Sequence, residues 1–390
     1  MITREEILEL AKFQVAAEAC ALSFYFQPQR PQNKSHREEA ILAKDLVRQA
    51  LREAEKNGRN GIMREDLDRI LDLAGHLHGN QARAKAVFAC IAKNFWREFD
   101  LPPQLPATQL FLNDRFHLKP LAALLGAQPR LWVVLVDRRR GRFFELRLDE
   151  LAEREGVFHE LPRRGRSDGF AGYDGGHAER RLEDDAMHHF KKVAERLKDA
   201  HEKGHFERLI IGCQESLWPE FEPHLHPYVK QRLLEHFPAD MATIASEQIR
   251  ERAQRILLQW QESRRQSLVR EVLGQAQRNA NGVTGLRRVL EALELGEVQI
   301  LLLGEKFRAP GVECRNCGHL DAHIVPSCPL CAHSTRELVD VCDAIVPQAI
   351  CRDIELFYVK DDASFDRVGN IGALLRFRVD QNKPSILAAS

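Results

Sequence analysis

The chain has 390 residues, of which 44% are hydrophobic and 29% charged, and its 57 Lys and Arg residues balance 57 Asp and Glu residues. This length exceeds the size at which a single hydrophobic core stops growing, so we expect two or three domains. A formal net charge of zero excludes indiscriminate nucleic-acid binding through overall basic excess, so any RNA contact must be local. The first residues read as a helix start rather than a signal peptide, and no apolar run approaches the ~20 residues of a membrane span. We therefore expect a cytoplasmic protein with no membrane partner.

The first part of the sequence predicts an α+β domain over residues 1–106, which ends in the proline-rich segment 101–106. The second of its helices should bury an apolar face made of Ile41, Leu42, Leu46 and Leu51. The expected elements are, in order, a helix over 3–18, an aromatic-rich strand over 20–26, helices over 35–56 and 63–77, and a hairpin of 87–92 and 95–99 that turns at Lys93 and Asn94.

A central α/β domain is expected over residues 107–262. A long helical run over 241–277, in which a bend near 261–266 is plausible, leads from it into the third domain. The expected elements before that run are a buried strand over 131–136, a basic turn over 138–141, a returning strand over 142–148, a Gly- and Arg-rich loop over 163–177, a charged helix over 177–203 and a strand over 208–212.

The third expected domain, residues 263–390, is a small α/β sandwich with a cysteine-rich ribbon over 312–333 inserted after a strand. Gly296 suits the left-handed conformation that ends a helix. The segment Ser334-Thr-Arg-Glu337 has the pattern of a capping box and predicts a helix start. The expected elements are a helix over 284–295, strands over 298–303 and 354–359, and a strand over 372–379.

Four cysteines in this domain have the spacing of a zinc ribbon: Cys314-Arg-Asn-Cys317, ten residues, then Cys328-Pro-Leu-Cys331. Four thiolates satisfy tetrahedral Zn²⁺ and leave no position for water, so the zinc would be structural. Two disulfides or four unrelated thiols are the alternatives. The remaining cysteines lie in apolar surroundings and should be buried free thiols: Cys20, Cys90, Cys213, Cys342 and Cys351.

The segments 289–303 and 370–377, together with the four cysteines between them, resemble the third domain of archaeal and eukaryotic class-1 release factors and of Pelota. In archaeal members that domain carries a similar cysteine ribbon at the same place. The resemblance implies a multidomain α/β and α+β fold of three domains, in which residues 1–106 correspond to the decoding domain.

Two functional motifs of that family are altered here. Gly175-Gly-His177 resembles the catalytic Gly-Gly-Gln tip, in which Gln positions the attacking water, but His stands in the Gln position. Asn33-Lys-Ser35 is one residue short of the Asn-Ile-Lys-Ser motif that reaches the stop codon. Stop-codon reading and peptidyl-tRNA hydrolysis are therefore not expected, although an imidazole could in principle act as a general base.

The glycines still suit a basic loop that approaches RNA backbone closely, and a solvated loop without such a role is the alternative. The candidate RNA-binding residues are Arg138, Arg139, Arg140, Arg142, Arg163, Arg164, Arg166, Gly175, Gly176 and His177.

The resemblance implies a non-catalytic factor that occupies the A site of idle 70S ribosomes and contacts rRNA there. Elongation factor Tu or another translational GTPase is the expected partner, and P-site tRNA is a possible neighbour. The alternative is a ribosome-rescue factor, which either hydrolyses peptidyl-tRNA or recruits a GTPase in a Pelota-like way.

Overall fold

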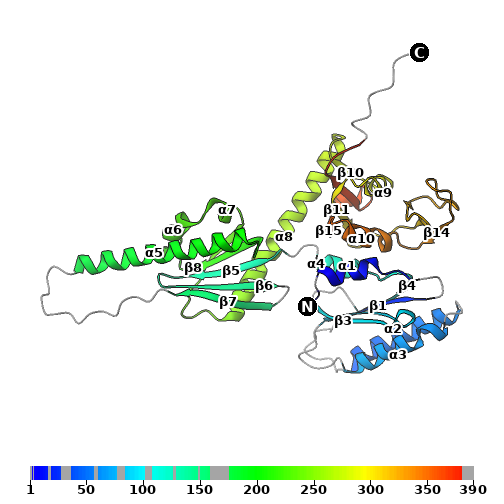
Figure 1. Ribbon diagram of the computed structural model, residues 1–390, viewed down its shortest axis with the longest axis horizontal. Coiled ribbons are helices and arrows are strands. Elements are labelled where there is room, and N and C mark those ends of the chain that lie inside the picture. The colour runs from blue at the N-terminus through cyan, green and yellow to red at the C-terminus, as the bar shows by residue number, and fades with distance from the viewer. Residues whose placement is uncertain are drawn as a thin grey trace, which may run out of the picture. The chain divides into compact units, whose positions relative to one another are not determined.

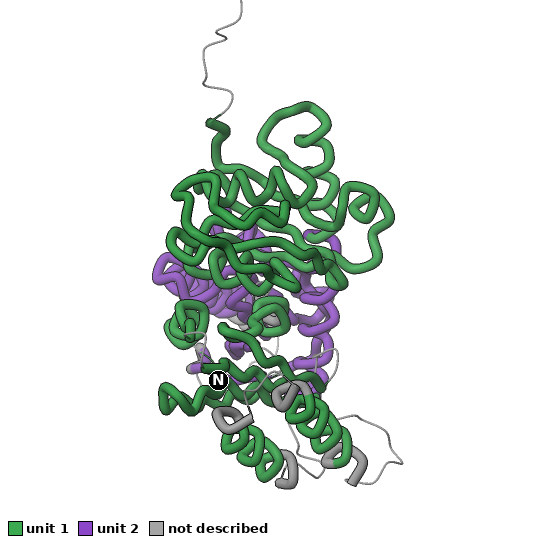
Figure 2. Tube along the Cα trace, turned by 90° about the vertical axis from the view of Figure 1, so that its right-hand side faces the viewer, with its two compact units in different colours: residues 1–127, 265–390 green, residues 128–264 purple. Residues whose placement is uncertain are grey.

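The chain divides into two compact units, residues 1–127 with 265–390 and residues 128–264, which Figure 2 distinguishes by colour. The multidomain α/β and α+β fold expected from the sequence is confirmed, and the first and third expected domains share the first unit. The computed structural model describes residues 2, 4–15, 19–27, 37–56, 60–76, 84–101, 108–125, 129–147, 150–158 and 175–379.

The first part of unit 1 is a four-stranded antiparallel sheet in the order β3-β2-β1-β4, with helices on both faces (Figure 1). Alternate residues of β1 explain the two layers: Phe24 packs against α2 and α3, and Tyr25 packs in the core that includes α1. The elements are α1 (Arg4–Lys12), β1 (Ala21–Phe26), α2 (Arg37–Lys56), α3 (Asn60–His76), β2 (Ala84–Cys90), a 3₁₀ turn (Ile91–Lys93), β3 (Phe95–Leu101), β4 (Gln109–Asn113) and α4 (Lys119–Leu125).

The sheet continues past the boundary expected at residue 106, because β4 pairs with β1. The first helix ends at Lys12 rather than near Glu18, since Gln14 is extended and bridges to Arg115. The hairpin of β2 and β3 is confirmed, and Asn94 makes its turn in the left-handed conformation with φ +48°.

The buried face of α2 differs from the prediction. Ala43, Val47 and Ala50 pack against the sheet, whereas Ile41 and Leu42 are 53% and 38% exposed. The spacing i, i+4, i+7 of the small residues forms its own helical stripe. Because the aromatic side chains of β1 fill the space beneath the helix, small residues let it approach the sheet closely.

Unit 2 is a five-stranded sheet in the order β7-β6-β5-β8-β9, in which β5, β8 and β9 are parallel. Helix α5 covers one face of this sheet and the first half of α8 covers the other (Figure 1). The predicted strands over β5, β6 and β8 and the helix over α5 are confirmed, and β7 and β9 were not predicted. The elements are β5 (Leu131–Val136), β6 (Arg140–Arg147), β7 (Glu150–Phe158), α5 (Gly175–Glu202), β8 (Arg208–Cys213), α6 (Trp218–Phe221), α7 (Pro227–Lys230), β9 (Leu233–Pro238) and α8 (Ser246–Gln277).

Helix α8 is continuous over its 32 residues, so the chain has no break near 261–266. Its amino-terminal half contributes Ile249, Ile256 and Leu257 to the core of unit 2. Its carboxy-terminal half contributes Leu268 and Val272 to a core of unit 1. The two units are therefore joined by one unbroken helix.

The second part of unit 1 contains a sheet in the order β10-β16-β11-β15, with the ribbon inserted after β11 as expected. The elements are β10 (Gly282–Thr284), α9 (Leu286–Glu294), β11 (Val298–Gly304), the ribbon strands β12 (Gly311–Cys314), β13 (Leu320–Asp321) and β14 (Thr335–Leu338), then α10 (Cys342–Cys351), β15 (Glu355–Val359), α11 (Ala363–Asp366) and β16 (Ile371–Leu375).

The prediction of a helix that starts at Ser334 is wrong, because residues 335–338 form the strand β14, which pairs with β12. The Thr335 hydroxyl donates a hydrogen bond to the Val325 carbonyl and is not a helix cap. The next helix, α10, begins instead at Cys342, whose amide donates to the Asp340 carboxylate at 3.0 Å.

The free thiols of Cys20, Cys90, Cys213 and Cys342 are buried as predicted, and burial raises the pKa of Cys213 to about 11. Cys351 is exposed, which corrects the prediction for that residue. Within the described residues, no helix combines the length and apolar character needed to cross a membrane.

Substitution by alanine should change the stability of the protein in opposite directions at two glycines. A Cβ on Gly212 in β8 would lie 2.5 Å from Leu135 Cδ2 and 2.8 Å from the Phe237 ring, so Gly212→Ala should destabilise the protein by about 1–3 kcal/mol. A Cβ on Gly274 in α8 would meet nothing closer than 3.4 Å, so Gly274→Ala should stabilise it by about 0.5–1 kcal/mol. Urea unfolding of both variants measures the two signs, and equal shifts would contradict the packing described for β8.

Candidate functional site

The four cysteines of the ribbon lie on two turns of the same design. In the first turn the Cys314 amide donates to the His319 carbonyl at 2.8 Å, and in the second the Cys328 amide donates to the His333 carbonyl at 2.8 Å. Each turn closes with a residue of positive φ, Gly318 at +72° and Ala332 at +60°. The repeated geometry presents two sulfurs from each turn to a common centre.

The sulfurs are spaced as a tetrahedral ion requires. The Sγ atoms of Cys314 and Cys331 are 3.4 Å apart, those of Cys317 and Cys328 are 3.6 Å apart, and all four lie within 4.8 Å of one another. A metal–sulfur bond of about 2.3 Å in a regular tetrahedron places sulfurs about 3.8 Å apart. The cluster can therefore hold a metal ion, whereas two disulfides would need bonded sulfurs near 2.05 Å.

Backbone amides stabilise thiolates at this centre. The amide of Asn316 points to the Cys314 sulfur at 3.4 Å, and that of Leu330 points to the Cys328 sulfur at 3.4 Å. A hydrogen bond from the backbone of His333, followed by contacts with the other thiols, lowers the pKa of Cys331 to about 5. Ligands of a metal ion must be deprotonated, and the backbone donors favour that form at Cys331. At Cys317 a backbone hydrogen bond of His319 acts in the same direction, but burial and the neighbouring thiols outweigh it and raise the pKa of that thiol to about 12.

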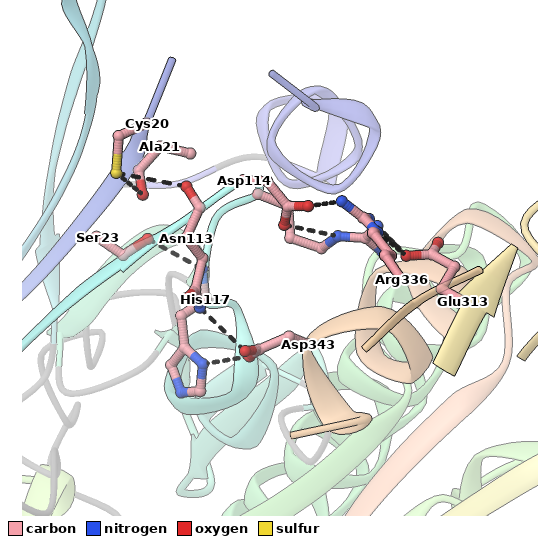
Figure 3. A network of polar contacts seen from close by, with 10 residues as sticks. Cys20, Ala21, Ser23, Asn113, Asp114, His117, Glu313, Arg336 and Asp343 are labelled. Carbon is pink, nitrogen blue, oxygen red and sulfur yellow. Dashed lines mark hydrogen bonds and ion pairs between the residues drawn. The ribbon is translucent and has the colours of Figure 1, made fainter. Parts of the chain in front are cut away.

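The ribbon is tied to the first part of unit 1 by a buried carboxylate beside the first cysteine. Glu313, the residue before Cys314, accepts a hydrogen bond from Arg115 at 2.6 Å, and the two side chains are 6% and 5% exposed. Arg336 of β14 bonds both Glu313 and Asp114 (Figure 3). One carboxylate of the ribbon thus serves two guanidinium groups, one from its own sheet and one from the segment after β4.

A second polar contact joins the same two parts at α10. His117 Nδ1 lies 2.6 Å from Asp343 Oδ1, and Asn113 Nδ2 donates to Asp343 Oδ2 at 3.0 Å (Figure 3). The Tyr25 hydroxyl donates to the His117 carbonyl at 2.6 Å, which anchors this segment to β1. Both contacts fix the ribbon-bearing part against the amino-terminal sheet.

The basic turn between β5 and β6 exposes only part of its predicted RNA-binding set. The Asp137 carboxylate accepts from the amides of Arg139 and Arg140, both at 2.6 Å, which fixes the turn and leaves these two side chains exposed. Arg138 donates to Glu220 at 2.9 Å. Arg142 donates to Glu153 at 2.7 Å, and this hydrogen bond raises the pKa of Arg142. The turn therefore offers two exposed arginines that form no ion pair within the described residues and two that are already paired.

Of the other predicted RNA-binding residues, three lie on a different element from that turn. Helix α5 begins at Gly175, so Gly175, Gly176 and His177 lie in its first turn and not in the loop expected over 163–177. Arg163, Arg164 and Arg166 lie outside the described residues, as do Asn33, Lys34 and Ser35.

The sequence reasoning missed the role of Glu313. A glutamate next to a zinc-ribbon cysteine carries no motif, and its partners are distant in the chain. The alternation of β12 is the signal that could have found it, because Val312 and Cys314 point to one face and Glu313 to the other.

Because Glu313 is buried, we expect that removing its charge lowers the free energy of unfolding substantially. Glu313→Gln leaves buried Arg115 with the more distant Asp114 carboxylate, at 3.7 Å, as its counter-charge, so it should destabilise the protein by about 3 kcal/mol. Glu153→Gln removes an exposed partner of Arg142 and should cost at most about 1 kcal/mol. Urea unfolding measures both, and a small effect of Glu313→Gln would show that the buried pair contributes little.

The comparisons with known proteins agree with this architecture. Residues 117–258 match the family model described as bacterial archaeo-eukaryotic release factor family 10. Peptide chain release factor subunit 1 of Thermococcus sibiricus is 23% identical over 309 residues, which cover 72% of this chain and 74% of that protein. Its counterpart in Pyrococcus abyssi is 24% identical over 313 residues, with the same coverage.

Among solved structures, the chain is similar to Pelota of Archaeoglobus fulgidus, with 14% identity, 78% of this chain and 82% of that chain covered, and a TM-score of 0.32. The matched family model lies over the central unit, and the curated relatives extend the match over most of the chain. The central part of the chain is therefore similar to bacterial archaeo-eukaryotic release factor family 10, and 72% of the chain is similar to archaeal peptide chain release factor subunit 1.

Proposed function

We propose that this protein is a soluble, cytoplasmic, non-catalytic factor that occupies the A site of idle 70S ribosomes and protects them. The observation that carries the proposal is a release-factor-type central domain in which His177 replaces the catalytic Gln. The proposed partners are rRNA of the A site, elongation factor Tu or another translational GTPase, and P-site tRNA as a neighbour.

The altered tip supports binding without hydrolysis. In the release factors the glycine pair lets the backbone enter the peptidyl-transferase centre and the Gln positions water. Here Gly175 and Gly176 lie in the first turn of a helix, and an imidazole follows them. Transition-state stabilisation depends on placing the water within a fraction of an ångström, so a side chain of different reach and shape removes the chemistry while the domain keeps its binding role.

The RNA contacts are proposed to be local, as zero net charge requires. Arg139 and Arg140 are exposed on a turn that is fixed by Asp137, so they can reach phosphate groups without losing an ion pair. Arg138 and Arg142 would have to exchange Glu220 and Glu153 for phosphates. We therefore assign the stronger contribution to Arg139 and Arg140.

The ribbon is proposed to hold one structural Zn²⁺ through Cys314, Cys317, Cys328 and Cys331. The donor set is four soft sulfurs with spacing close to that of a tetrahedral site. Such thiolate ligands favour zinc, whereas magnesium and calcium favour oxygen ligands. With four protein ligands the ion has no open position. Its role would be to close the ribbon and so to hold Glu313 in place.

Ribosome binding is the direct test. Purified protein should cosediment with vacant 70S ribosomes in a salt-sensitive manner, elongation factor Tu should increase binding, and A-site tRNA should compete. Arg139→Gln with Arg140→Gln should weaken binding about tenfold or more and reduce its salt dependence. Arg287→Gln with Arg288→Gln, which changes the charge equally on α9, is the matched control and should have no effect.

Three results would contradict the proposal. Absence of cosedimentation under every salt condition would remove the ribosome from the list of partners. Binding only to complexes stalled on mRNA would favour the rescue alternative. Release of peptide from peptidyl-tRNA by the parent protein, lost in His177→Ala, would show that the chain is a hydrolase.

Metal content tests the zinc proposal separately. The parent protein should contain one zinc per chain, and Cys317→Ser should lose it and lower the melting temperature. Cys351→Ser changes an exposed free thiol and is the matched control. Full zinc content in Cys317→Ser, or a metal-free parent purified in the presence of zinc, would refute the assignment.

A further inference from the structure

Three arginines gather at the amino ends of the parallel strands of unit 2. Strand β8 begins at Arg208, and the residue before β9 is Arg232, whose carbonyl accepts a hydrogen bond from the Leu209 amide at 2.9 Å. Because β8 and β9 are parallel, their first residues lie side by side at one edge of the sheet.

The third arginine reaches this edge from α8. The guanidinium carbon of Arg208 lies 4.9 Å from the centre of the Trp260 ring, and Arg264 follows Trp260 by one helical turn. Arg208, Arg232 and Arg264 are each half-buried. We refer to them below as the edge cluster.

The edge cluster brings three like charges together, with Glu207 as a nearby counter-charge of Arg208. Burial lowers the pKa of Arg208, and the charges of Arg232 and Arg264 lower it further, which indicates that the three groups repel one another. In the part of the chain that the structure describes, no carboxylate forms an ion pair with any of the three. The neighbouring Glu207 is bound by Arg130 at 2.9 Å.

Several other arginines of unit 2 form ion pairs with glutamates of the same unit. Arg138 is paired with Glu220 and Arg142 with Glu153, while Glu145 serves both Arg147 and Arg154. In the edge cluster, by contrast, Arg208 Nε is buried and has no hydrogen-bond partner among the described residues. Arg208 Nη1 donates to the Glu207 carbonyl at 3.2 Å, but this bond leaves Nε unmet. Half-buried cations that form no ion pair among the described residues lose hydration, so an external anion would relieve both the repulsion and the unmet hydrogen bond of Arg208 Nε.

We propose that the edge cluster of Arg208, Arg232 and Arg264 is a second RNA site, which binds the phosphodiester backbone. The guanidinium group matches phosphate oxygens with two parallel donors, and Trp260 fixes one of the three in place beneath the site. Three groups spread over two strands and a helix suit a chain of phosphates better than one small anion. The choice of RNA over an acidic protein segment rests on the proposed function, under which the ligand is rRNA.

The test uses the full-length protein and a fluorescein-labelled single-stranded RNA of about 20 nucleotides in a salt series. Arg232→Gln with Arg264→Gln should weaken binding about 10- to 100-fold at low salt and reduce the slope of log K against log salt by about 1.4, or 0.7 for each phosphate contact. Arg287→Gln with Arg288→Gln is the matched control and should stay within twofold of the parent. Arg208 is left in place because it packs on Trp260.

Folding and binding are separated by the melting temperature. Removal of two mutually repelling charges should leave the melting temperature unchanged or raise it, so weaker binding by a variant of unchanged melting temperature supports the site. RNA affinity equal to that of the parent, or equal losses in the variant and the control, would overturn it. Displacement of the RNA by polyglutamate at equal charge concentration would show an acidic protein ligand instead and would also overturn it.

The same variants in ribosome cosedimentation distinguish this site from the proposed function. Ribosome binding by the parent with an unchanged salt slope in Arg232→Gln with Arg264→Gln would refute the edge cluster and leave the proposed function standing. Loss of RNA affinity in that variant, combined with a parent that does not bind ribosomes, would support the site and refute the proposed function.

Discussion

The buried carboxylate of Glu313 is the contact on which the ribbon's position depends. It lies next to a cysteine of the four-cysteine cluster, and together with Asp114 it pairs with Arg115 and Arg336, of which Arg115 is buried and Arg336 is partly desolvated. A buried ion pair of this kind contributes little net stability compared with an apolar contact, but it is intolerant of the wrong geometry. The ribbon is therefore held in one orientation against the amino-terminal sheet, together with α10 and its Asp343 contact.

Helix α8 imposes the second constraint. Its residues pack into one core near Ile256 and into another near Val272, and no break separates them. One continuous helix therefore contributes apolar side chains to the cores of both units.

Local pattern predicted the buried strands β5 and β8 and the four-cysteine cluster, and failed where tertiary contact decided. The all-apolar run of β5 and the cysteine spacing need no knowledge of their partners. The capping-box pattern at Ser334 was overridden by pairing with β12, and the apolar residues Ile41 and Leu42 were displaced by a stripe of small residues that fits the sheet. The sequence did not predict the edge cluster, because its arginines come from separate segments that only the parallel sheet and α8 bring together.

The two turns of the metal centre are alike in hydrogen bonding but unequal in the conformational freedom of their last residue. Glycine at position 318 adopts a positive φ without penalty, whereas alanine at position 332 does so at a cost of about 1 kcal/mol. Exchange of the two residues would therefore act in opposite directions: Ala332→Gly would relieve that backbone cost, whereas Gly318→Ala would add one to the first turn.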